Sequence, residues 1–379
     1  MDFIDLKRQY RAYRQEIDQA VSAVIQSGRF ILGEEVSLLE QELAEFTGAG
    51  SAVAVSSGTD ALIVALMAAE AGPGQEIITT PFTFIATAEA IALSGARPLF
   101  VDIDPKTFNM DVNRLAELLE ARSRRGRMPS GIIPVSLFGL CADMDRINSL
   151  AQKHGLFVLE DACQSMGATY GKRLSCNLSS MAATSFFPSK PLGGYGDGGM
   201  AFFSDPDLAG RARCLRVHGE TSRYRHEYIG LNARLDAIQA AVLRVKLRHF
   251  PNEIEARQRA ADRYSSLLES FREHVAVPEV PEDYKSVFAQ YTVRIKGGIR
   301  DRVAAFMNSM QVPTAVHYPV PIHLQKAFAF LGYRQGDFPE AERACQEVLS
   351  LPMHALIEES EQEQVIAAMR AALEHLKKI

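Results

Sequence analysis

Several features of specialised protein classes are missing from this chain of 379 residues. Its five cysteines are an odd number without a C-x-x-C pair, which argues against a disulfide scaffold and against a zinc site. No apolar run approaches the roughly 18 residues of a membrane span, and the polar start MDFIDLKRQYRAYRQEI is unlike a signal peptide. A net charge of −5 gives no basic excess for nucleic acid. We therefore expect a reduced, cytoplasmic protein with no metal, no membrane and no nucleic-acid partner.

Two nucleotide-binding motifs are also absent. The first apolar run leads into SSGTDAL (56–62) and not into G-x-G-x-x-G, which argues against a dinucleotide-binding enzyme. In TSFFPSKPLGGYGDGG (184–199) the lysine precedes the glycines, whereas a P-loop places its lysine after them, followed by Ser or Thr.

What the chain does contain is an alternation of short apolar runs with helical patterns, which predicts an α/β fold with a buried, mostly parallel seven-stranded sheet. Only the lysine-glycine loop separates the last two runs. Because that loop is too short for a helical crossover, one of these strands is expected to run antiparallel. The runs are SAVAVS (51–56), EIIT (76–79), RPLFVD (97–102), GIIPVS (131–136), LFVLED (156–161), ATSFF (183–187) and GMAFF (199–203).

The pattern changes after about residue 235. Residues 235–271 predict long helices, and AQYTVRI (289–295) predicts an alternating strand in a mixed terminal region. We place a domain boundary near residue 245. The expected domains are a large one over 1–245, with an N-terminal helical segment, and a smaller C-terminal α+β domain over 246–379.

Lys190 lies in the lysine-glycine loop, between Pro188 and Pro191. The glycines that follow could simply make a flexible loop with a solvated lysine. The alternative is a lysine used as an amine, which forms a Schiff base with a carbonyl compound such as pyridoxal phosphate (PLP). That function needs a carboxylate for the pyridine nitrogen, a phosphate site and an aromatic residue against the ring.

Candidates for these partners follow other strands, at the sheet edge where ligands bind in open α/β folds. SSGTDAL opens a helix, and Gly58 would let a phosphate approach its free N–H groups, although the same turn could be only a helix cap. Asp161 ends a buried run and needs a cationic partner, unless it too only caps a helix. Gln164 could bond the ring hydroxyl, and Phe84 could lie on the ring or in the core.

Along the chain the motifs follow the order phosphate site, aromatic residue, D-x-x-Q, and then S-x-x-x-x-K followed by glycines. In this order they resemble those of the DegT/StrS family of nucleotide-sugar aminotransferases, which are fold-type-I PLP enzymes. The resemblance covers essentially the whole chain, including PFTFIATAEAI, IPVSLFGLCADM, EDACQSMGA, SFFPSKPLGGYGDGG, LNARLDAIQAA and PTAVHYP. It implies PLP as cofactor, glutamate as amino donor and a homodimer with sites shared across its interface. The implied catalytic residue is Lys190, the site of the Schiff base. The implied cofactor contacts are Asp161 with the pyridine nitrogen, Gln164 with the ring oxygen, Phe84 with the ring, Gly58, Thr59 and Ser185 with the phosphate, and Asn232 with the phosphate of the neighbouring subunit's cofactor.

Within that family, the sequence is most similar to aminotransferases that act on UDP-2-acetamido-2-deoxy-3-oxo-glucuronate, for bacterial surface polysaccharides. Such relatives carry a tyrosine where Phe30 stands. Phenylalanine lacks the hydroxyl, so Phe30 is expected to contact the substrate through its backbone. By the same likeness, the sugar-nucleotide contacts are Gly28, Phe30, Ser189, Arg234, His317 and Tyr318. Gly28 could instead end a helix, Arg234 could form an interface ion pair, and His317-Tyr318 could be a structural turn.

Two alternatives within the PLP reading stay open. One is an aminotransferase for another 3-keto or 4-keto sugar carried on UDP, dTDP or GDP. The other is a PLP-binding regulator without turnover, which we would expect to carry a basic DNA-binding segment; none is found in the sequence.

Overall fold

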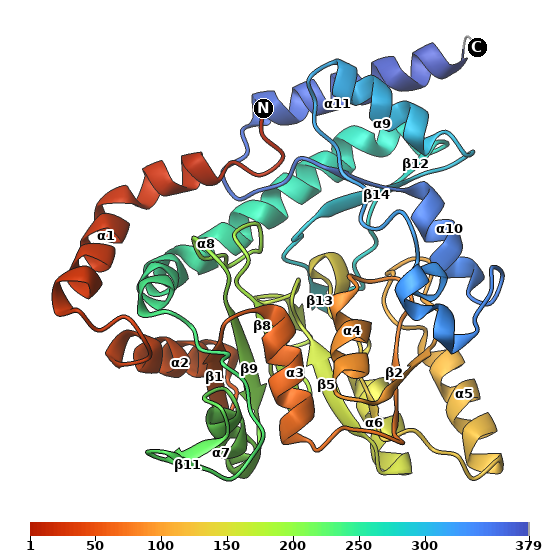
Figure 1. Ribbon diagram of the computed structural model, residues 1–379. Helices are drawn as coiled ribbons and strands as arrows, with labels where there is room; N and C mark the ends of the chain where they lie inside the picture. The colour runs from red at the N-terminus through yellow and green to blue at the C-terminus, as the bar shows by residue number, and fades with distance from the viewer. Residues whose placement is uncertain (378–379) are drawn as a thin grey trace.

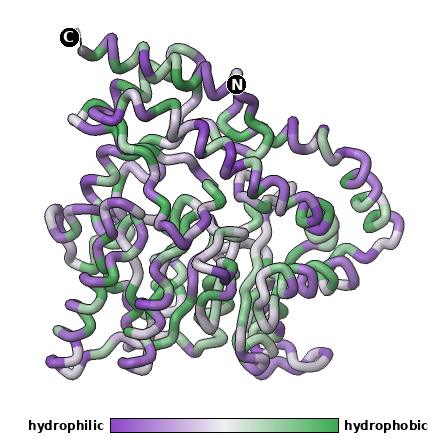
Figure 2. Tube along the Cα trace, turned by 180° about the vertical axis from the view of Figure 1, so that it is seen from behind, coloured by the Kyte–Doolittle hydropathy of each residue, from purple (hydrophilic) through white to green (hydrophobic). Residues whose placement is uncertain are grey.

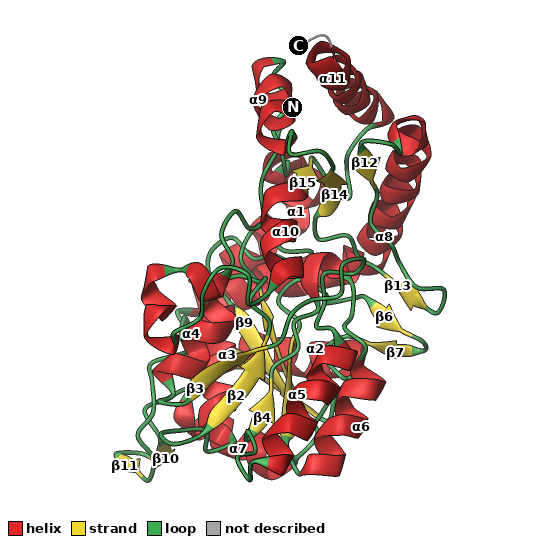
Figure 3. Ribbon diagram, turned by 90° about the vertical axis from the view of Figure 1, so that its right-hand side faces the viewer, coloured by secondary structure: helices red, strands yellow, loops and turns green. Residues whose placement is uncertain are grey.

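A seven-stranded sheet with helices on both faces forms the core of the larger part of the molecule, the lower half in Figures 1 and 3. The computed structural model describes residues 1–377. The strands lie in the order β1-β9-β8-β5-β4-β2-β3, which confirms the predicted α/β fold. Their bounds are β1 (Ser51–Val55), β2 (Glu76–Thr79), β3 (Arg97–Phe100), β4 (Gly131–Ile132), β5 (Phe157–Asp161), β8 (Met181–Ser185) and β9 (Gly199–Phe203).

β9 is the antiparallel strand that the short lysine-glycine loop predicted. It pairs antiparallel with both β8 and β1, whereas the other neighbouring pairs of the sheet are parallel. β1, β8 and β5 therefore point the same way, and their carboxyl ends meet at one edge of the sheet.

β4 is shorter than the predicted run 131–136. Pro134 has no N–H to donate to a ladder, so regular pairing stops at Ile132. The segment nevertheless stays beside β5, because the carbonyl of Pro134 accepts a hydrogen bond from the N–H of Asp161 at 2.9 Å.

Alternate residues of the strands pack against different helices. In β1, Val53 and Val55 join the cluster on one face of the sheet, and Ala52 and Ala54 join the cluster on the other. This is the period of two that a buried strand requires. One face is covered by α3 (Gly58–Ala68), α4 (Ala86–Leu93) and α7 (Pro206–Leu215); the other is covered by α2 (Glu34–Thr47), α5 (Val112–Arg124), α6 (Met144–His154) and α8 (Ala237–Leu268).

α8 is one continuous helix of 32 residues that contains Pro251, where the sequence predicted several long helices. Its first half packs with the sheet through Leu243 and Leu247, and its second half joins the C-terminal core through Tyr264 and Leu268. Packing on both sides of Pro251 offsets the stability that the helix loses because proline cannot donate a backbone hydrogen bond. The expected boundary near residue 245 lies inside this helix, and the division into two domains stays a prediction.

The C-terminal part is built on a smaller antiparallel sheet, β12-β14-β15. α1 (Leu6–Ser27), at the other end of the chain, lies along α8 and packs Ile17 against Val242 and Val245. Hydrophobic and hydrophilic residues alternate along the outer helices in Figure 2. The C-terminal elements are β12 (Val275–Ala276), β14 (Tyr291–Ile295), α9 (Arg300–Ser309), α10 (Pro339–Glu347), β15 (Val348–Leu351) and α11 (Glu359–Lys377); the small strands are β6 (Thr169–Tyr170), β7 (Arg173–Leu174), β10 (Glu220–Ser222), β11 (Arg225–His226) and β13 (Tyr284–Lys285).

None of the helices within residues 1–377 is both long enough and apolar enough to cross a membrane.

Candidate active site

A cavity of about 410 Å³ lies at the edge of the sheet where β1, β2, β5 and β8 end. Because the parallel strands end together, segments far apart in the sequence meet there. The predicted site residues that line this cavity are Gly58, Thr59, Phe84, Asp161, Gln164, Ser185, Ser189, Lys190, His317 and Tyr318.

Asp161 is the buried carboxylate of the site. It ends β5 and is only 4% exposed. One oxygen accepts a hydrogen bond from the hydroxyl of Thr87 at 2.7 Å, and the other accepts one from the N–H of Cys163 at 3.1 Å. Within the described residues, Asp161 has no basic side chain in ion-pair contact. A buried carboxylate of this kind suits a cationic ligand group, such as a protonated pyridine nitrogen.

Lys190 faces the same cavity and is half-buried. Burial lowers the pKa of its amine, and the nearby Cys163 and Asp161 oppose that change only in part. A lowered pKa leaves a larger fraction of the amine neutral, and the neutral form is the nucleophile.

The glycines after Lys190 are tightly packed, which argues against the flexible-loop interpretation. A Cβ added to Gly193 would lie 2.4 Å from the carbonyl oxygen of Pro188, and one added to Gly199 would lie 2.3 Å from that of Ser57. The buried Lys246 of α8 also donates a hydrogen bond to the carbonyl of Gly193. Glycine is therefore required here for close backbone approach, and the loop holds Lys190 in place.

The start of α3 offers a site for a phosphate. Ser57 caps the helix by accepting a hydrogen bond from the N–H of Asp60 at 3.0 Å. Gly58 and Thr59, in the first turn, line the cavity, where free N–H groups and the helix dipole favour an anion. A Cβ on Gly58 would lie 2.6 Å from the Cβ of Ser185, so the glycine lets the start of α3 approach the end of β8.

Gln164 connects the cavity floor to the C-terminal part. Its side-chain oxygen accepts a hydrogen bond from the N–H of Phe138 at 2.9 Å, and its amide nitrogen donates to the hydroxyl of Tyr318 at 3.2 Å. Phe84 is not a core residue: it is 54% exposed and its ring centroid lies 6.0 Å from that of Tyr318.

His317 lines the cavity next to Tyr318. Its Nδ1 forms a hydrogen bond with the hydroxyl of Ser350 at 3.1 Å. Burial lowers the pKa of His317, and the charge of Lys190 adds to the effect. The imidazole is therefore favoured in its neutral form.

Four predicted residues do not line the cavity of their own chain. Gly28 ends α1 in the left-handed conformation, as its alternative interpretation required, with φ of 64°. Phe30 and Asn232 are exposed, and Arg234 is half-buried. The expectation that Asn232 acts on a neighbouring subunit is compatible with this position, and it stays a prediction.

Several other lining residues were not predicted from the sequence. Thr87 bonds Asp161 from the first turn of α4, and its spacing of three from Phe84 was the one available signal. Cys163, Phe187, Asp197 and Gln290 also line the cavity. Gln290 directly precedes β14 in the C-terminal part, so nothing local indicates that it reaches this site.

The model of the DegT/DnrJ/EryC1/StrS aminotransferase family matches residues 11–370. The UDP-2-acetamido-2-deoxy-3-oxo-D-glucuronate aminotransferase of Pseudomonas aeruginosa is 45% identical over 97% of this chain and 99% of its own length. A pleiotropic regulatory protein of Geobacillus stearothermophilus is 43% identical over 98% of each chain.

A crystal structure of a DegT DnrJ EryC1 StrS aminotransferase from Brucella abortus matches the fold with a TM-score of 0.93. It is 41% identical and covers 98% of this chain and 99% of its own. The chain therefore belongs to the DegT/DnrJ/EryC1/StrS aminotransferase family, and it is a nucleotide-sugar aminotransferase that depends on pyridoxal phosphate.

Proposed function

We propose that this enzyme transfers an amino group from glutamate to C3 of a UDP-linked 3-keto-N-acetylglucosaminuronate. The observation that carries the proposal is the 45% identity, over nearly the full length of both chains, to a relative named for that sugar. The cavity supports the amino-transfer chemistry of this proposal, because it combines an amine, a buried carboxylate and a helix N-terminus at one edge of the sheet.

The residues of the cavity fit the cofactor. When bound, PLP supplies an electron sink for charge that develops at the carbon bearing the amino group. Lys190 would accept and return the proton at that carbon through Nζ. The proposed contacts are Asp161 with the pyridine nitrogen, Gln164 with the ring oxygen, Phe84 with the ring face, and Gly58, Thr59 and Ser185 with the phosphate.

We further propose that the active form is a homodimer. A single chain leaves Ile229 91% exposed and Tyr224 79% exposed, and Phe187 on the cavity wall is 51% exposed. Burial of apolar side chains of this size favours association. In such a dimer, Asn232 would reach the phosphate of the partner's cofactor.

The substrate would meet residues on both sides of that interface. Ser189, His317 and Tyr318 lie on the cavity wall of one chain. Arg234 would approach from the partner and pair with the C6 carboxylate, since an anion in an enclosed site needs a cationic or hydrogen-bonding partner. Gly28 and Phe30 would also contact the sugar nucleotide from the partner subunit, Phe30 through its backbone.

The direct test is an amino-transfer assay on the purified protein. A partner dehydrogenase acting on UDP-N-acetylglucosaminuronate would generate the 3-keto sugar in place, and mass spectrometry would detect the product. We expect a 3-amino sugar that forms only when glutamate is present. Ready amination of 4-keto-6-deoxy sugars, with no reaction of the uronate, would show that the proposed substrate is wrong.

The similarity to a pleiotropic regulatory protein is the one observation for the alternative of a PLP-binding regulator without turnover, whereas the match to the aminotransferase family favours the enzyme. The same assay separates the two functions. A regulator would bind the cofactor and show its visible absorbance, yet form no amino sugar from any keto-sugar nucleotide offered.

A further inference from the structure

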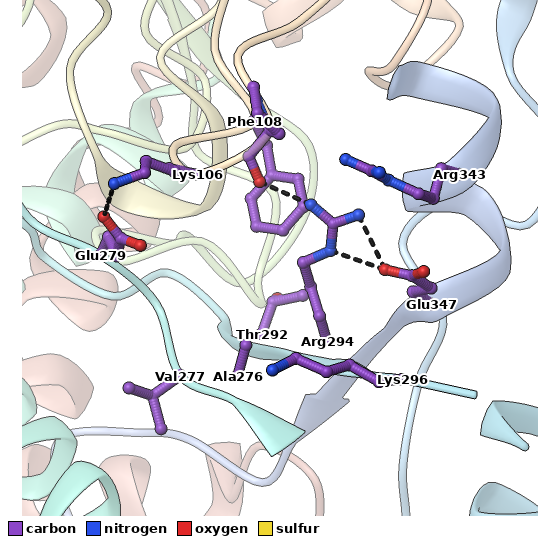
Figure 4. A pocket seen from close by; sticks show the side chains of 11 residues that line it. Lys106, Phe108, Ala276, Val277, Glu279, Thr292, Arg294, Lys296, Arg343 and Glu347 are labelled. Carbon is purple, nitrogen blue, oxygen red and sulfur yellow. Dashed lines mark hydrogen bonds and ion pairs between the residues drawn. The ribbon is translucent and has the colours of Figure 1, made fainter. Parts of the chain in front are cut away.

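A second cavity lies outside the PLP site, between the C-terminal sheet and a loop that follows β3 (Figure 4). Its volume is about 400 Å³, and it shares no lining residue with the cavity around Lys190. Its walls come from the loop at 105–108, from β12 and β14, and from α10. A ligand in this cavity would therefore touch both parts of the chain.

Basic side chains predominate in its lining. The lining contains four cations, Lys106, Arg294, Lys296 and Arg343, and two carboxylates, those of Glu279 and Glu347. A third carboxylate, that of Glu340, lies outside the lining and pairs with Arg343. The four cations come from three different segments, and in Figure 4 the guanidinium of Arg294 lies in the middle of the group. The uneven balance of charge favours an anionic occupant.

Arg294 forms the fixed centre of this cluster. Its Nε and Nη2 contact Glu347 at 2.9 and 2.7 Å, and its Nη1 donates to the carbonyl of Pro105 at 2.6 Å. The guanidinium carbon lies 5.6 Å from the ring centroid of Phe108. These contacts hold the guanidinium in one orientation, and it still has N–H donors that they leave unengaged.

The other three cations are more exposed and more loosely held. Lys106 pairs with Glu279 at 3.2 Å, and both side chains are more than half exposed, so the attraction between them is weak. Arg343 pairs with Glu340 within α10. Lys296 has no carboxylate within ion-pair distance among residues 1–377, and its amine donates to the carbonyl of Arg272 at 3.3 Å.

We propose that this cavity binds the phosphate group of a small anion, at a site separate from the catalytic one. A phosphate presents several charged oxygens in different directions, whereas a carboxylate presents two in a plane. That geometry matches cations placed around Arg294, with Lys106 and Arg343 above it and Lys296 below it in Figure 4. The occupant is therefore a free phosphate or diphosphate, or the diphosphate of a nucleotide.

Calorimetric titration of the PLP-loaded protein tests this proposal. Pyrophosphate and uridine diphosphate are each titrated into the wild type, into Lys296→Ala/Arg343→Ala, and into Lys153→Ala/Arg302→Ala. The last variant loses the same charge from two exposed cations outside the cavity, and cofactor absorbance verifies that each variant is folded.

Pyrophosphate should bind the wild type saturably, and more weakly as the salt concentration rises. Lys296→Ala/Arg343→Ala loses two charge-assisted contacts, so it should bind pyrophosphate at least about tenfold more weakly. The control variant should bind like the wild type.

For uridine diphosphate, binding that remains in the cavity variant belongs to the catalytic site, and the part that is lost belongs to this cavity. Loss for both ligands identifies the diphosphate as the recognised group, and loss for uridine diphosphate alone identifies a nucleotide. Equal binding of both ligands to all three proteins, or equal weakening in the control variant, would overturn the proposal.

Discussion

At the scale of single residues, Lys190 lies in a tightly packed loop, and burial lowers the pKa of its amine. We expect Lys190→Ala to lose transamination entirely, because the proposed mechanism uses its Nζ for both cofactor attachment and proton transfer. Borohydride should link the cofactor covalently to Lys190 in the wild type, detectable by peptide mass spectrometry. Lys172→Ala, which changes an exposed lysine, is the control and should keep full activity. Full turnover in Lys190→Ala would contradict the assignment.

Asp161 carries the second prediction. Asp161→Asn keeps the shape of the side chain but removes its charge, so the pyridine nitrogen would lose its counter-ion. We expect kcat to fall by at least about a hundredfold, which corresponds to about 2.7 kcal/mol of transition-state stabilisation. Thr87→Val removes only one hydrogen bond to Asp161 and should cost less. A loss of less than about threefold in steady-state kinetics would mean that Asp161 serves only as a cap.

Arg234 carries the prediction about the sugar. If it pairs with the C6 carboxylate, Arg234→Ala should weaken the reaction of the uronate more than Arg234→Lys does, since lysine keeps the charge. A substrate analogue with a neutral C6 group should lose less kcat/KM from the same mutation. Equal losses for the charged and neutral substrates would show that Arg234 has a structural role.

At the scale of secondary-structure elements, the strand ends were the most predictable part of the site. Lys190, Asp161 and Gly58 lie at or just after the ends of three different apolar runs, and a parallel sheet necessarily brings such positions to one edge. Thr87 and Gln290 could not be found in this way. Their contacts depend on how α4 and the C-terminal part pack over that edge, and such packing cannot be predicted from the local sequence.

The contact of α8 with the lysine-glycine loop leads to a prediction about pH. Burial lowers the pKa of Lys246 to about 8, below the value of about 10.4 expected in the unfolded chain. Between these values the unfolded chain binds more protons, so the contribution of Lys246 to stability should increase with pH there. Lys246→Met should remove this increase.

Urea unfolding between roughly pH 7.5 and pH 10 would measure the effect. Lys153→Met, at an exposed lysine of α6, should behave like the wild type. The same dependence on pH in Lys246→Met as in the wild type would mean that the buried amine does not titrate in this window.

At the scale of the whole molecule, the proposed sharing of each site between two chains predicts complementation between inactive variants. Lys190→Ala and Asn232→Ala should each be inactive alone. In a mixed dimer, one of the two sites would receive both native residues, so activity should return after subunit exchange. Light scattering and differently tagged subunits would verify the exchange. No recovery under those conditions would count against a site built from two chains.

The continuity of α8 limits how the protein can be divided. A truncated protein starting at residue 246 would begin inside the helix and would expose Leu247 and Phe250, which now pack against α2. The apparent boundary in the sequence is thus a poor place to cut, and residues 246–379 are unsuited to expression as an autonomous module. For protein engineers, swapping C-terminal parts between relatives calls for a junction outside α8, so that the whole helix is inherited from one parent.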